Sequence, residues 1–500
     1  MLSRCPALTT TFFRTRPVVA PWLAACSFAV ALAATFAAFG ALAWGLRDTG
    51  EPQMPGGSVV APLFAVAVFF IGYDVAVGLV LIGALLVSFR RSAATTAPAS
   101  FSAEPPAVSV LIAAWNEVDA LTDTVRRWAA QDGVPFEILV GDDGSSDGST
   151  DAIVRDLGLV RLVCLGADCF GGDFGGIPIR VFAFPHAGKG ATLNALAPHA
   201  RHAVLLTVDA DTTPAPRALA LVARAFVDAD VDVATGVVSI RNGRAGWLLG
   251  NQSAEYLKNA WARTAWSALG ALEQVPGAFS AIRAPLFAAA GGFPTDSLTE
   301  DYELTFRCIA KGVVCGRAPV VVVVPAAQVF TDGPATVAGF IRQRTRWFAG
   351  FLTTLFRFRA LIGRASAGAF GVVRLPLKLV DAVLPAVAVV SLAVLVSGGL
   401  HAAFGVMRTS LALFAIRWLW DMFVYACATS ASHRLGSPEL SASAAPPVAV
   451  GWLLTAIEAL GYVWFKHLAA LRGIGWAVRR VRTWETSRQT GLAPVAPPEK

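Results

Sequence analysis

Two aspartates close an apolar run and raise the first question of chemistry. In LLTVDADTTPAP (205–216), Asp209 and Asp211 are separated by a single residue. Side chains on an extended segment alternate between two faces, so this spacing predicts that both carboxylates point to one side. Paired carboxylates repel unless a cation joins them, and oxygen ligands suit Mg²⁺ or Mn²⁺. Because magnesium is often held by one or two carboxylates together with substrate phosphates, the pattern favours a metal-bound diphosphate, and a solvated turn is the alternative.

Further acidic pairs stand at comparable places in the chain. Asp142 and Asp143 end the apolar strand predicted in FEILVGDDGSSDGSTD (136–151). TEDYELTFR (299–307) puts Glu300 and Asp301 at the start of a predicted helix. Because acids favour the first turn of a helix, capping is the structural alternative for Asp301.

Basic and aromatic side chains form two short motifs. QRTRW (343–347) contains Gln343, Arg344, Arg346 and Trp347, and an arginine can bind phosphate through two parallel N–H bonds. The alternative for the arginines is that they are cations at a membrane interface. Lys189 lies in GKG, which lacks the Walker spacing, so its glycines also fit an ordinary turn.

Alternating strands and helices must position these residues. Strands are predicted within 107–117, 136–151, 159–165, 177–185 and 203–208, with helices at 121–131 and 186–200 and a glycine-rich loop at Gly171–Gly176. This order predicts a mostly parallel sheet with helices on both faces. Ligands bind beyond the carboxyl ends of the strands in such sheets, and both aspartate pairs occupy such ends.

The composition indicates a membrane protein. The chain is 55% hydrophobic and 15% charged, with a mean hydropathy of +0.59. Val18–Leu46 has no charged residue and Val59–Phe89 has one, and both exceed the roughly 20 residues that cross a bilayer. The seven cysteines show no metal-ligand spacing, which predicts scattered reduced thiols. The net charge of +7 comes with arginines that flank membrane segments, so it indicates topology rather than nucleic-acid binding.

The distribution of arginine and lysine predicts an N-terminus inside the cell and a large cytoplasmic domain. Residues 335–378 hold seven arginines, one lysine and no acid, which predicts cationic helices along the inner membrane face. Three further spans are expected at about 379–400, 409–429 and 447–465. Together with two N-terminal spans, these three would make five and put the C-terminus outside the cell. The arginines near the C-terminus instead favour a position inside. We expect 409–429 to be the segment that does not cross simply, because it carries Arg417 and Asp421.

Four charged residues lie within the apolar stretches: Asp74, Arg417, Asp421 and Glu458. Such charges normally face a bundle interior or an aqueous path. The sequence leaves two hypotheses open for them, a hydrated polysaccharide channel and a structural set of ion pairs.

Taken in order, the motifs resemble those of the processive membrane glycosyltransferases of family 2, which include cellulose, chitin, hyaluronan and poly-N-acetylglucosamine synthases. The ordered set is VSVLIAAWNE, DDGSSDGSTD, GKGATLN, VDADTTP, PGAFSAIRAPLFAAAGGF, LTEDYEL and QRTRW, within about residues 107–350. The TDGP segment (331–334) departs from the family pattern, and no role follows for the glycine-rich insert at 166–178.

The resemblance implies an α/β fold of GT-A type inserted between transmembrane helices. It implies that Trp115, Asp142 and Asp143 bind the nucleoside of the donor, that Glu117 binds substrate and that Lys189 lies near the nucleotide. Asp209 and Asp211 would bracket the sugar diphosphate and an Mg²⁺ or Mn²⁺ ion, and Asp301 beside Glu300 would be the catalytic base. Gln343, Arg346 and Trp347 would contact the diphosphate and shape the acceptor end.

The expected organisation has five parts. They are two N-terminal transmembrane helices (1–97), a cytoplasmic GT-A domain (98–340), interfacial amphipathic helices with QRTRW (341–378), C-terminal transmembrane helices (379–470) and a cytoplasmic tail (471–500). The resemblance implies a multi-pass protein of the inner cell membrane, with the catalytic domain in the cytoplasm.

The resemblance also implies an inverting, processive β-glycosyltransferase that polymerises a UDP-sugar and passes the polysaccharide across the membrane. Its expected partners are the donor, a growing polysaccharide or lipid acceptor, membrane lipid and a small accessory membrane subunit, with no nucleic acid. Transfer of one sugar to a lipid carrier and an inactive transport or scaffold subunit are the alternatives.

Overall fold

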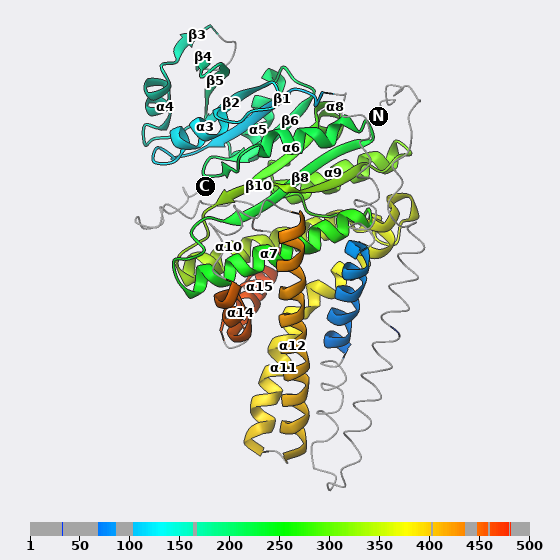
Figure 1. Ribbon diagram of the computed structural model, residues 1–500. Helices are drawn as coiled ribbons and strands as arrows, with labels where there is room; N and C mark the ends of the chain where they lie inside the picture. The colour runs from blue at the N-terminus through cyan, green and yellow to red at the C-terminus, as the bar shows by residue number, and fades with distance from the viewer. Residues whose placement is uncertain are drawn as a thin grey trace.

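The computed structural model describes residues 69–86, 104–163, 168–401, 404–435, 448–458 and 461–479, together with Ala33 and Val481. The first expected span, 18–46, lies outside the described residues except for Ala33, as does nearly all of the expected tail. Helices and strands alternate along the chain up to about residue 331, and helices alone follow (Figure 1).

Ten strands form one sheet. They are β1 (Val108–Ala114), β2 (Phe136–Asp143), β3 (Val160–Leu162), β4 (Asp168–Phe174), β5 (Ile177–Phe184), β6 (Val204–Asp209), β7 (Thr213–Pro214), β8 (Val231–Ile240), β9 (Phe279–Arg283) and β10 (Val320–Thr331). Their order across the sheet is β3-β4-β5-β2-β1-β6-β9-β8-β10-β7.

The α-helices are α3 (Leu121–Ala129), α4 (Ser149–Leu157), α5 (Lys189–Leu196), α6 (Ala218–Arg224), α7 (Trp247–Ala268), α8 (Ala284–Ala289), α9 (Glu300–Val314), α10 (Val337–Arg357), α11 (Leu375–His401), α12 (Phe404–Leu435), α14 (Val448–Ile457) and α15 (Tyr462–Val478). An apolar helix, Phe69–Leu86, precedes them. The domain boundary expected at residue 340 falls inside α10.

The sheet is mixed, which corrects the expectation of a mostly parallel one. Four strand pairs are parallel and five are antiparallel. One cause is β9, which runs antiparallel between β6 and β8. As a result Phe279, the first residue of β9, pairs with Val208 at the carboxyl end of β6 and brings residues 276–278 to that edge.

The glycine-rich insert is a strand, which corrects the predicted loop at Gly171–Gly176. β4 pairs antiparallel with β5, and Gly175 and Gly176 form the turn between them with φ of 62° and 86°. A two-residue hairpin turn of type I′ requires positive φ at both positions, which glycine adopts without strain. The insert therefore extends the sheet beyond β5.

Two hydrophobic cores cover the two faces of the sheet. Val110 and Ile112 of β1 belong to one core, and Leu111 between them belongs to the other. This alternation is the two-residue period of a strand that is buried on both faces. Helices α3, α4 and α6 contribute to the first core, and α5, α7 and α9 to the second.

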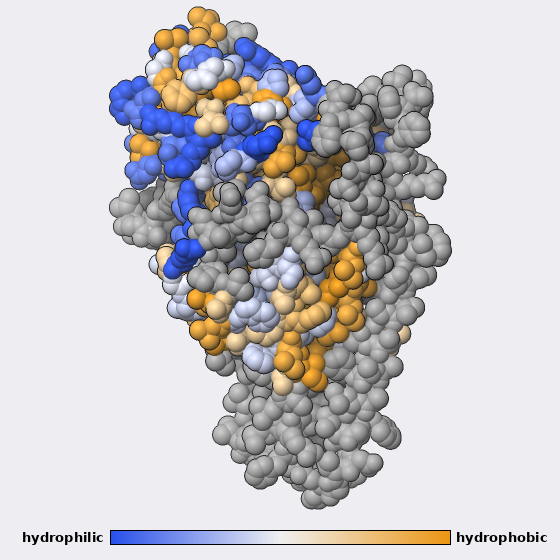
Figure 2. All heavy atoms as spheres, viewed as in Figure 1, coloured by the Kyte–Doolittle hydropathy of each residue, from blue (hydrophilic) through white to orange (hydrophobic). Residues whose placement is uncertain are grey.

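Helices α7 and α10 lie between the sheet and the C-terminal helices (Figure 1). α7 packs on β8 and β10 and also on α12 and α14, whereas α10 packs on α15. On the face in Figure 2, hydrophilic residues gather over the sheet and hydrophobic residues over the helices below it. Helix α7 therefore connects the sheet to the C-terminal helices.

The C-terminal helices differ from the expected spans. α11 and α12 are continuous helices of 27 and 32 residues, so 409–429 is not interrupted. The segment 447–465 is the broken one, because α14 has 10 residues and a separate helix, α15, follows it. By length and hydropathy, Phe69–Leu86 is the one helix within the described part of the chain that is apolar enough to cross a membrane.

The four charged residues in the apolar stretches form ion pairs. Arg417 contacts Asp74 and also Asp421, whose carboxylate lies 3.0 Å from its guanidinium. Glu458 lies 2.6 Å from Lys258 and 3.2 Å from Lys466. Of the two hypotheses, these contacts favour the structural ion pairs.

Candidate functional site

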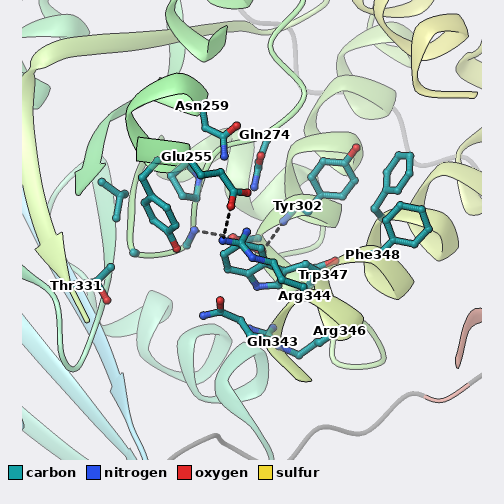
Figure 3. Close-up of a pocket in the computed structure, with 18 of the residues that line it drawn as sticks. Glu255, Asn259, Gln274, Tyr302, Thr331, Gln343, Arg344, Arg346, Trp347 and Phe348 are labelled. Atoms are coloured by element: carbon teal, nitrogen blue, oxygen red, sulfur yellow. Dashed lines mark hydrogen bonds and ion pairs between the residues drawn. The ribbon is translucent and has the colours of Figure 1, made fainter. Parts of the chain in front are cut away.

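A cavity of about 510 Å³ lies where the end of β6, the start of α9 and the sides of α7 and α10 meet. Several residues singled out from the sequence line it together: Lys189, Asp209, Glu300, Asp301, Gln343, Arg344, Arg346 and Trp347. Figure 3 shows those from α10 opposite Asn259 and Gln274. The chain thus brings acids, cations and an indole from positions 189 to 347 into one space.

Lys189 stands between two of the carboxylates. Its ammonium donates a hydrogen bond to Asp209 and lies 3.4 Å from Glu300 Oε1. Burial alone would lower the pKa of Lys189, but Asp209, Glu300 and Asp301 raise it above its usual range. Lys189 is therefore a fixed positive charge at the end of β6.

Asp301 is held by backbone donors. The Gly277 N–H donates to its Oδ2 at 2.7 Å, and the Tyr302 N–H donates to its Oδ1 at 2.8 Å. Burial raises the pKa of Asp301 and the carboxylate of Glu300 raises it further, while Lys189 opposes both effects. A carboxylate of raised pKa that lines a cavity is suited to take a proton from a bound hydroxyl.

Asp143 organises the segment that carries Lys189. Its buried carboxylate accepts hydrogen bonds from the N–H groups of Ala187 and Gly188 at 2.8 and 2.9 Å and from the Thr192 hydroxyl at 2.9 Å. Gly188 has a φ of 91°, which glycine adopts readily, and α5 begins at the next residue. The Asp143 carboxylate therefore holds the segment on both sides of Lys189 in place.

Four residues predicted to bind substrate are not among the residues that line the cavity: Trp115, Glu117, Asp142 and Asp143. Strand β1 lies between β2 and β6. Its Ala114 pairs with Asp142 of β2, and its Ala113 pairs with Asp209 of β6. With a strand spacing of about 4.8 Å, Asp142 and Asp209 lie on strands roughly 10 Å apart at one sheet edge. Their side chains therefore line neighbouring parts of that edge.

These residues already make contacts within the chain. Asp142 accepts a hydrogen bond from the Thr150 hydroxyl at 2.6 Å. Trp115 stacks on His186, with ring centroids 4.5 Å apart, and the Glu117 N–H donates to the Ser149 hydroxyl. A base that stacks on Trp115 must use its other face or displace His186.

Asp211 lies in a turn, which corrects the argument from an extended segment. β6 ends at Asp209, and the Thr212 N–H donates to the Asp209 carbonyl at 3.0 Å. The Asp211 carboxylate lies 3.5 Å from the hydroxyl of Thr331, which lines the cavity. The alternation of side chains along a strand therefore does not explain the separation of Asp209 and Asp211 by one residue. Asp211 is not among the residues that line the cavity.

The QRTRW motif lies on α10 with its side chains anchored individually. Arg346 donates to the Leu298 carbonyl at 2.8 Å. Arg344 is buried, donates to Glu255 at 3.2 Å and lies 4.3 Å from the ring centroid of Trp347. The alternative of an interfacial cation is therefore wrong for Arg344. The Gln343 carbonyl oxygen is buried without a hydrogen-bond partner among the described residues, as a ligand-binding amide would be.

The polar residues of the cavity that were missed from the sequence include Tyr256, Asn259, Arg263 and Gln274. Three of these four lie on α7. Positions 256, 259 and 263 are three and four residues apart, so they share one helical face. The sequence did carry a signal for these three residues. They form a polar stripe at helical spacing, with an arginine, in a segment rich in alanine and tryptophan.

Comparison with known proteins identifies the domain. The family described as "Glycosyl transferase family 2" matches residues 109–271, and "Glycosyl transferase family group 2" matches residues 204–437. Together these ranges contain every residue of the cavity except Lys466 and Ala470.

Two curated relatives cover about half of the chain. A "Beta-monoglucosyldiacylglycerol synthase" of Trichormus variabilis is 25% identical over 250 residues, which are 49% of this chain and 49% of that protein. A "Poly-beta-1,6-N-acetyl-D-glucosamine synthase" of Staphylococcus aureus is 26% identical over 253 residues, which are 50% of this chain and 56% of that protein. The chain thus spans about half the length of the curated relatives it matches.

A solved structure, "Mannosyltransferase PcManGT from Pyrobaculum calidifontis in complex with GDP-Man and Mn2+", is 19% identical with a TM-score of 0.48. It aligns with 80% of this chain and 99% of its own. The assignment rests on the family matches and on the acids and cations gathered at the carboxyl edge of a mixed sheet. The chain therefore carries a glycosyltransferase domain of family 2.

Proposed function

We propose that the protein is an inverting, processive β-glycosyltransferase that polymerises a UDP-sugar and passes the polysaccharide across the cell membrane. The observation that carries this proposal is the cavity itself, in which Asp301, the Lys189–Asp209 pair and Trp347 lie together. A sugar polymerase needs a base for the acceptor hydroxyl, charge for the leaving diphosphate and a surface for the growing end. The cavity supplies all three.

Each residue has a defined task in the proposed reaction. Asp301, held by two N–H donors, takes the proton of the attacking acceptor hydroxyl. Lys189 and Arg346 bind the departing diphosphate, and the indole of Trp347 stacks on the acceptor sugar. A single displacement inverts the anomeric centre, so an α-linked donor gives a β-linked product.

The carboxylates at the end of β6 fit a hard divalent cation that is shared with substrate. Asp209 is 34% exposed toward the cavity, and the described residues hold no group of three or more metal-ligating side chains. Two carboxylates leave positions for phosphate oxygens, which is how magnesium is usually held. Asp209 and Asp211 would hold Mg²⁺ or Mn²⁺, and the cation would neutralise the charge that develops on the leaving diphosphate.

Several features support a location in the membrane with the catalytic domain in the cytoplasm. Large apolar side chains are exposed on the helix Phe69–Leu86, on α12 and on α14, among them Leu79, Leu419 and Leu453. An α14 of 10 residues is about 15 Å long and cannot cross a core of roughly 30 Å. Beside Phe69–Leu86, we count the apolar segment 18–46 and also α11 and α12, which at 27 and 32 residues are longer than the roughly 20 residues that cross a bilayer. Four spans put both termini inside.

The alternative of single-sugar transfer to a lipid carrier has its own support. One of the matched relatives is named as a glycolipid synthase and another as a polysaccharide synthase. The complete QRTRW motif favours chain extension, and the presence of Lys189, Asp209 and Asp301 in one cavity disfavours an inactive scaffold.

The test is turnover of a panel of UDP-sugars by the purified full-length protein with Mg²⁺ or Mn²⁺, followed by sizing of the product. The proposal predicts UDP release and long chains. A single-sugar lipid product would favour the alternative, and no UDP release from any donor would contradict both.

A further inference from the structure

One wall of the cavity presents polar groups that the proposed reaction does not use. Tyr256, Asn259 and Arg263 lie on one face of α7, and Gln274 follows in the loop after that helix. Asn259 and Gln274 lie above Arg344 and Trp347 in Figure 3, opposite Gln343 and Arg346. This set, called the α7 wall below, faces the motif helix α10 across the cavity.

Arg263 differs from the other cations that line the cavity. Among the described residues, each of the others has a carboxylate or carbonyl partner: Lys189 with Asp209, Arg344 with Glu255, Arg346 with the Leu298 carbonyl, Lys378 with Glu273 and Asp381, and Lys466 with Glu458. Arg263 makes no hydrogen bond or ion pair with any residue that the structure describes, and it is half-buried.

Its surroundings do not compensate for its burial. Burial lowers the pKa of Arg263, and the electrostatic effects of Tyr256, Glu273 and Asp301 offset this lowering only in part. Glu273 is already paired with Arg374 and Lys378. Because an unpaired buried charge is costly, a guanidinium in this place is best explained by a ligand that supplies the counter-charge.

The two amides of the α7 wall are also unengaged. The side chains of Asn259 and Gln274 form no hydrogen bond within the described part of the chain, yet both line the cavity. Binding pockets typically place a few convergent polar groups on an otherwise closed wall. Two amides beside one guanidinium suit a ligand that has hydroxyl groups and an oxyanion.

Arg263 comes from a different element than the groups proposed to bind the diphosphate. Lys189 begins α5 and Asp209 ends β6, whereas Arg263 lies on α7. α7 packs on α12 and α14, from which an acceptor attached to the apolar part of the molecule would arrive. Asp301, the proposed base, is close enough to Arg263 to influence its titration.

We propose that the α7 wall is the acceptor site and that Arg263 makes it select an acceptor carrying an oxyanion, either a sugar carboxylate or a lipid phosphate. This inference rests on the proposed function and adds the chemical class of the acceptor. A planar guanidinium binds both groups through two N–H bonds, so the two sources share one recognition chemistry.

The experiment measures equilibrium binding to the full-length protein in a polyoxyethylene detergent, without donor. Two matched pairs of probes distinguish the sources: cellobiouronic acid against cellobiose, and dioctanoyl phosphatidic acid against dioctanoylglycerol. Calorimetry is expected to show the anionic member of one pair binding about tenfold or more tightly than its neutral partner, as a charge-assisted hydrogen bond allows. The pair that responds identifies the source.

Variants then assign the preference to one side chain. Arg263→Gln should reduce the preference to less than about threefold, and Arg263→Lys should retain part of it because it keeps the charge but not the fork. Arg359→Gln, an exposed arginine outside the cavity, is the matched control and should bind as the unmodified protein does. Melting temperatures verify that each variant is folded.

Two results would overturn the inference. One is equal binding of both members in both pairs. The other is a preference that survives in Arg263→Gln. If affinity for UDP-N-acetylglucosamine also falls in that variant, Arg263 belongs to the donor site. Because the binding assay needs no turnover, loss of the anion preference in Arg263→Gln would support the inference even if the protein proved not to be a polymerase.

Discussion

At the scale of single residues, Asp301 is shaped by opposing charges. Its carboxylate has Glu300 on one side and Lys189 on the other, and burial adds to the effect of Glu300. As a base it must be ionised, so turnover should fall as the pH drops through a pKa above the usual range of an aspartate.

Glu300→Gln should therefore shift the acid limb of the kcat profile to lower pH. Removing a like charge stabilises the ionised form of Asp301, which lowers its pKa and extends activity toward acid. The measurement is UDP release across a pH series at saturating donor. A limb that stays in place or moves to higher pH would contradict this account of Asp301.

Gly277 tests how closely the reacting groups must be held. A Cβ there would lie 3.1 Å from Asp301 Cβ and 3.3 Å from Lys189 Nζ. Gly277→Ala should lower kcat by roughly 10- to 100-fold, because displacement of a reacting group by about an ångström can cost that much. Gly475→Ala on α15 is the control, since a Cβ there meets nothing within 4 Å. Equal kcat in both variants would show that the contact is unimportant.

At the scale of elements, α7 and α10 are joined by a buried chain of contacts. Glu255 accepts hydrogen bonds from Arg344 and from the Tyr462 hydroxyl, and Arg344 covers the ring of Trp347. A comparable pair lies away from the cavity, where Glu137 accepts a hydrogen bond from Arg180 at 2.8 Å and Arg180 lies 5.9 Å from the Phe182 ring centroid.

Glu255→Gln should raise the acceptor KM while leaving the donor KM within about twofold, because the indole of Trp347 loses its support. Glu137→Gln is the matched control, because Glu137 is buried and pairs with Arg180 away from the cavity. Both changes remove one partner of a buried pair and should lower stability by about 3–5 kcal/mol. Only Glu255→Gln should affect the acceptor KM, and a double-mutant cycle with Trp347→Ala should give a coupling of about 1 kcal/mol. Equal kinetic effects in both variants would indicate a general structural role.

Several elements of the site could be predicted from the sequence because they follow local rules. β1, β2, β6 and α3 were evident from hydrophobic periodicity, and the acids at the ends of β2 and β6 follow from where parallel strands end. The contribution of α7 could not be predicted, because its place depends on the antiparallel return of β9. The turn at Asp211 was missed because a two-residue spacing fits either a strand or a turn.

At the scale of the whole molecule, the break between α14 and α15 determines the proposed topology. α15 packs on α10, which carries QRTRW, so residues 462–478 lie on the same side as the cavity. A simple count of apolar segments misplaced the interruption in 409–429, because Arg417 and Asp421 carry charge. In the structure Arg417 pairs with both Asp421 and Asp74, so α12 continues through Arg417 and Asp421.

Epitope tags at the two termini should therefore be accessible from the same side of the membrane. In inside-out vesicles both tags should be cleaved by added protease, and in sealed right-side-out vesicles neither should be. Arginines of α15, such as Arg472, favour the same side by the positive-inside rule. Opposite accessibility of the two tags would contradict the four-span arrangement.

The most direct measurement of the central claim compares the full-length protein with its Asp301→Asn variant. Both are assayed for UDP-sugar binding and for UDP release in Mn²⁺. Because a general base contributes about 10²- to 10⁴-fold, the variant should bind the donor within about twofold and release UDP at least 100-fold more slowly. Release by Asp301→Asn within tenfold of the unmodified protein would show that Asp301 does not take the acceptor's proton.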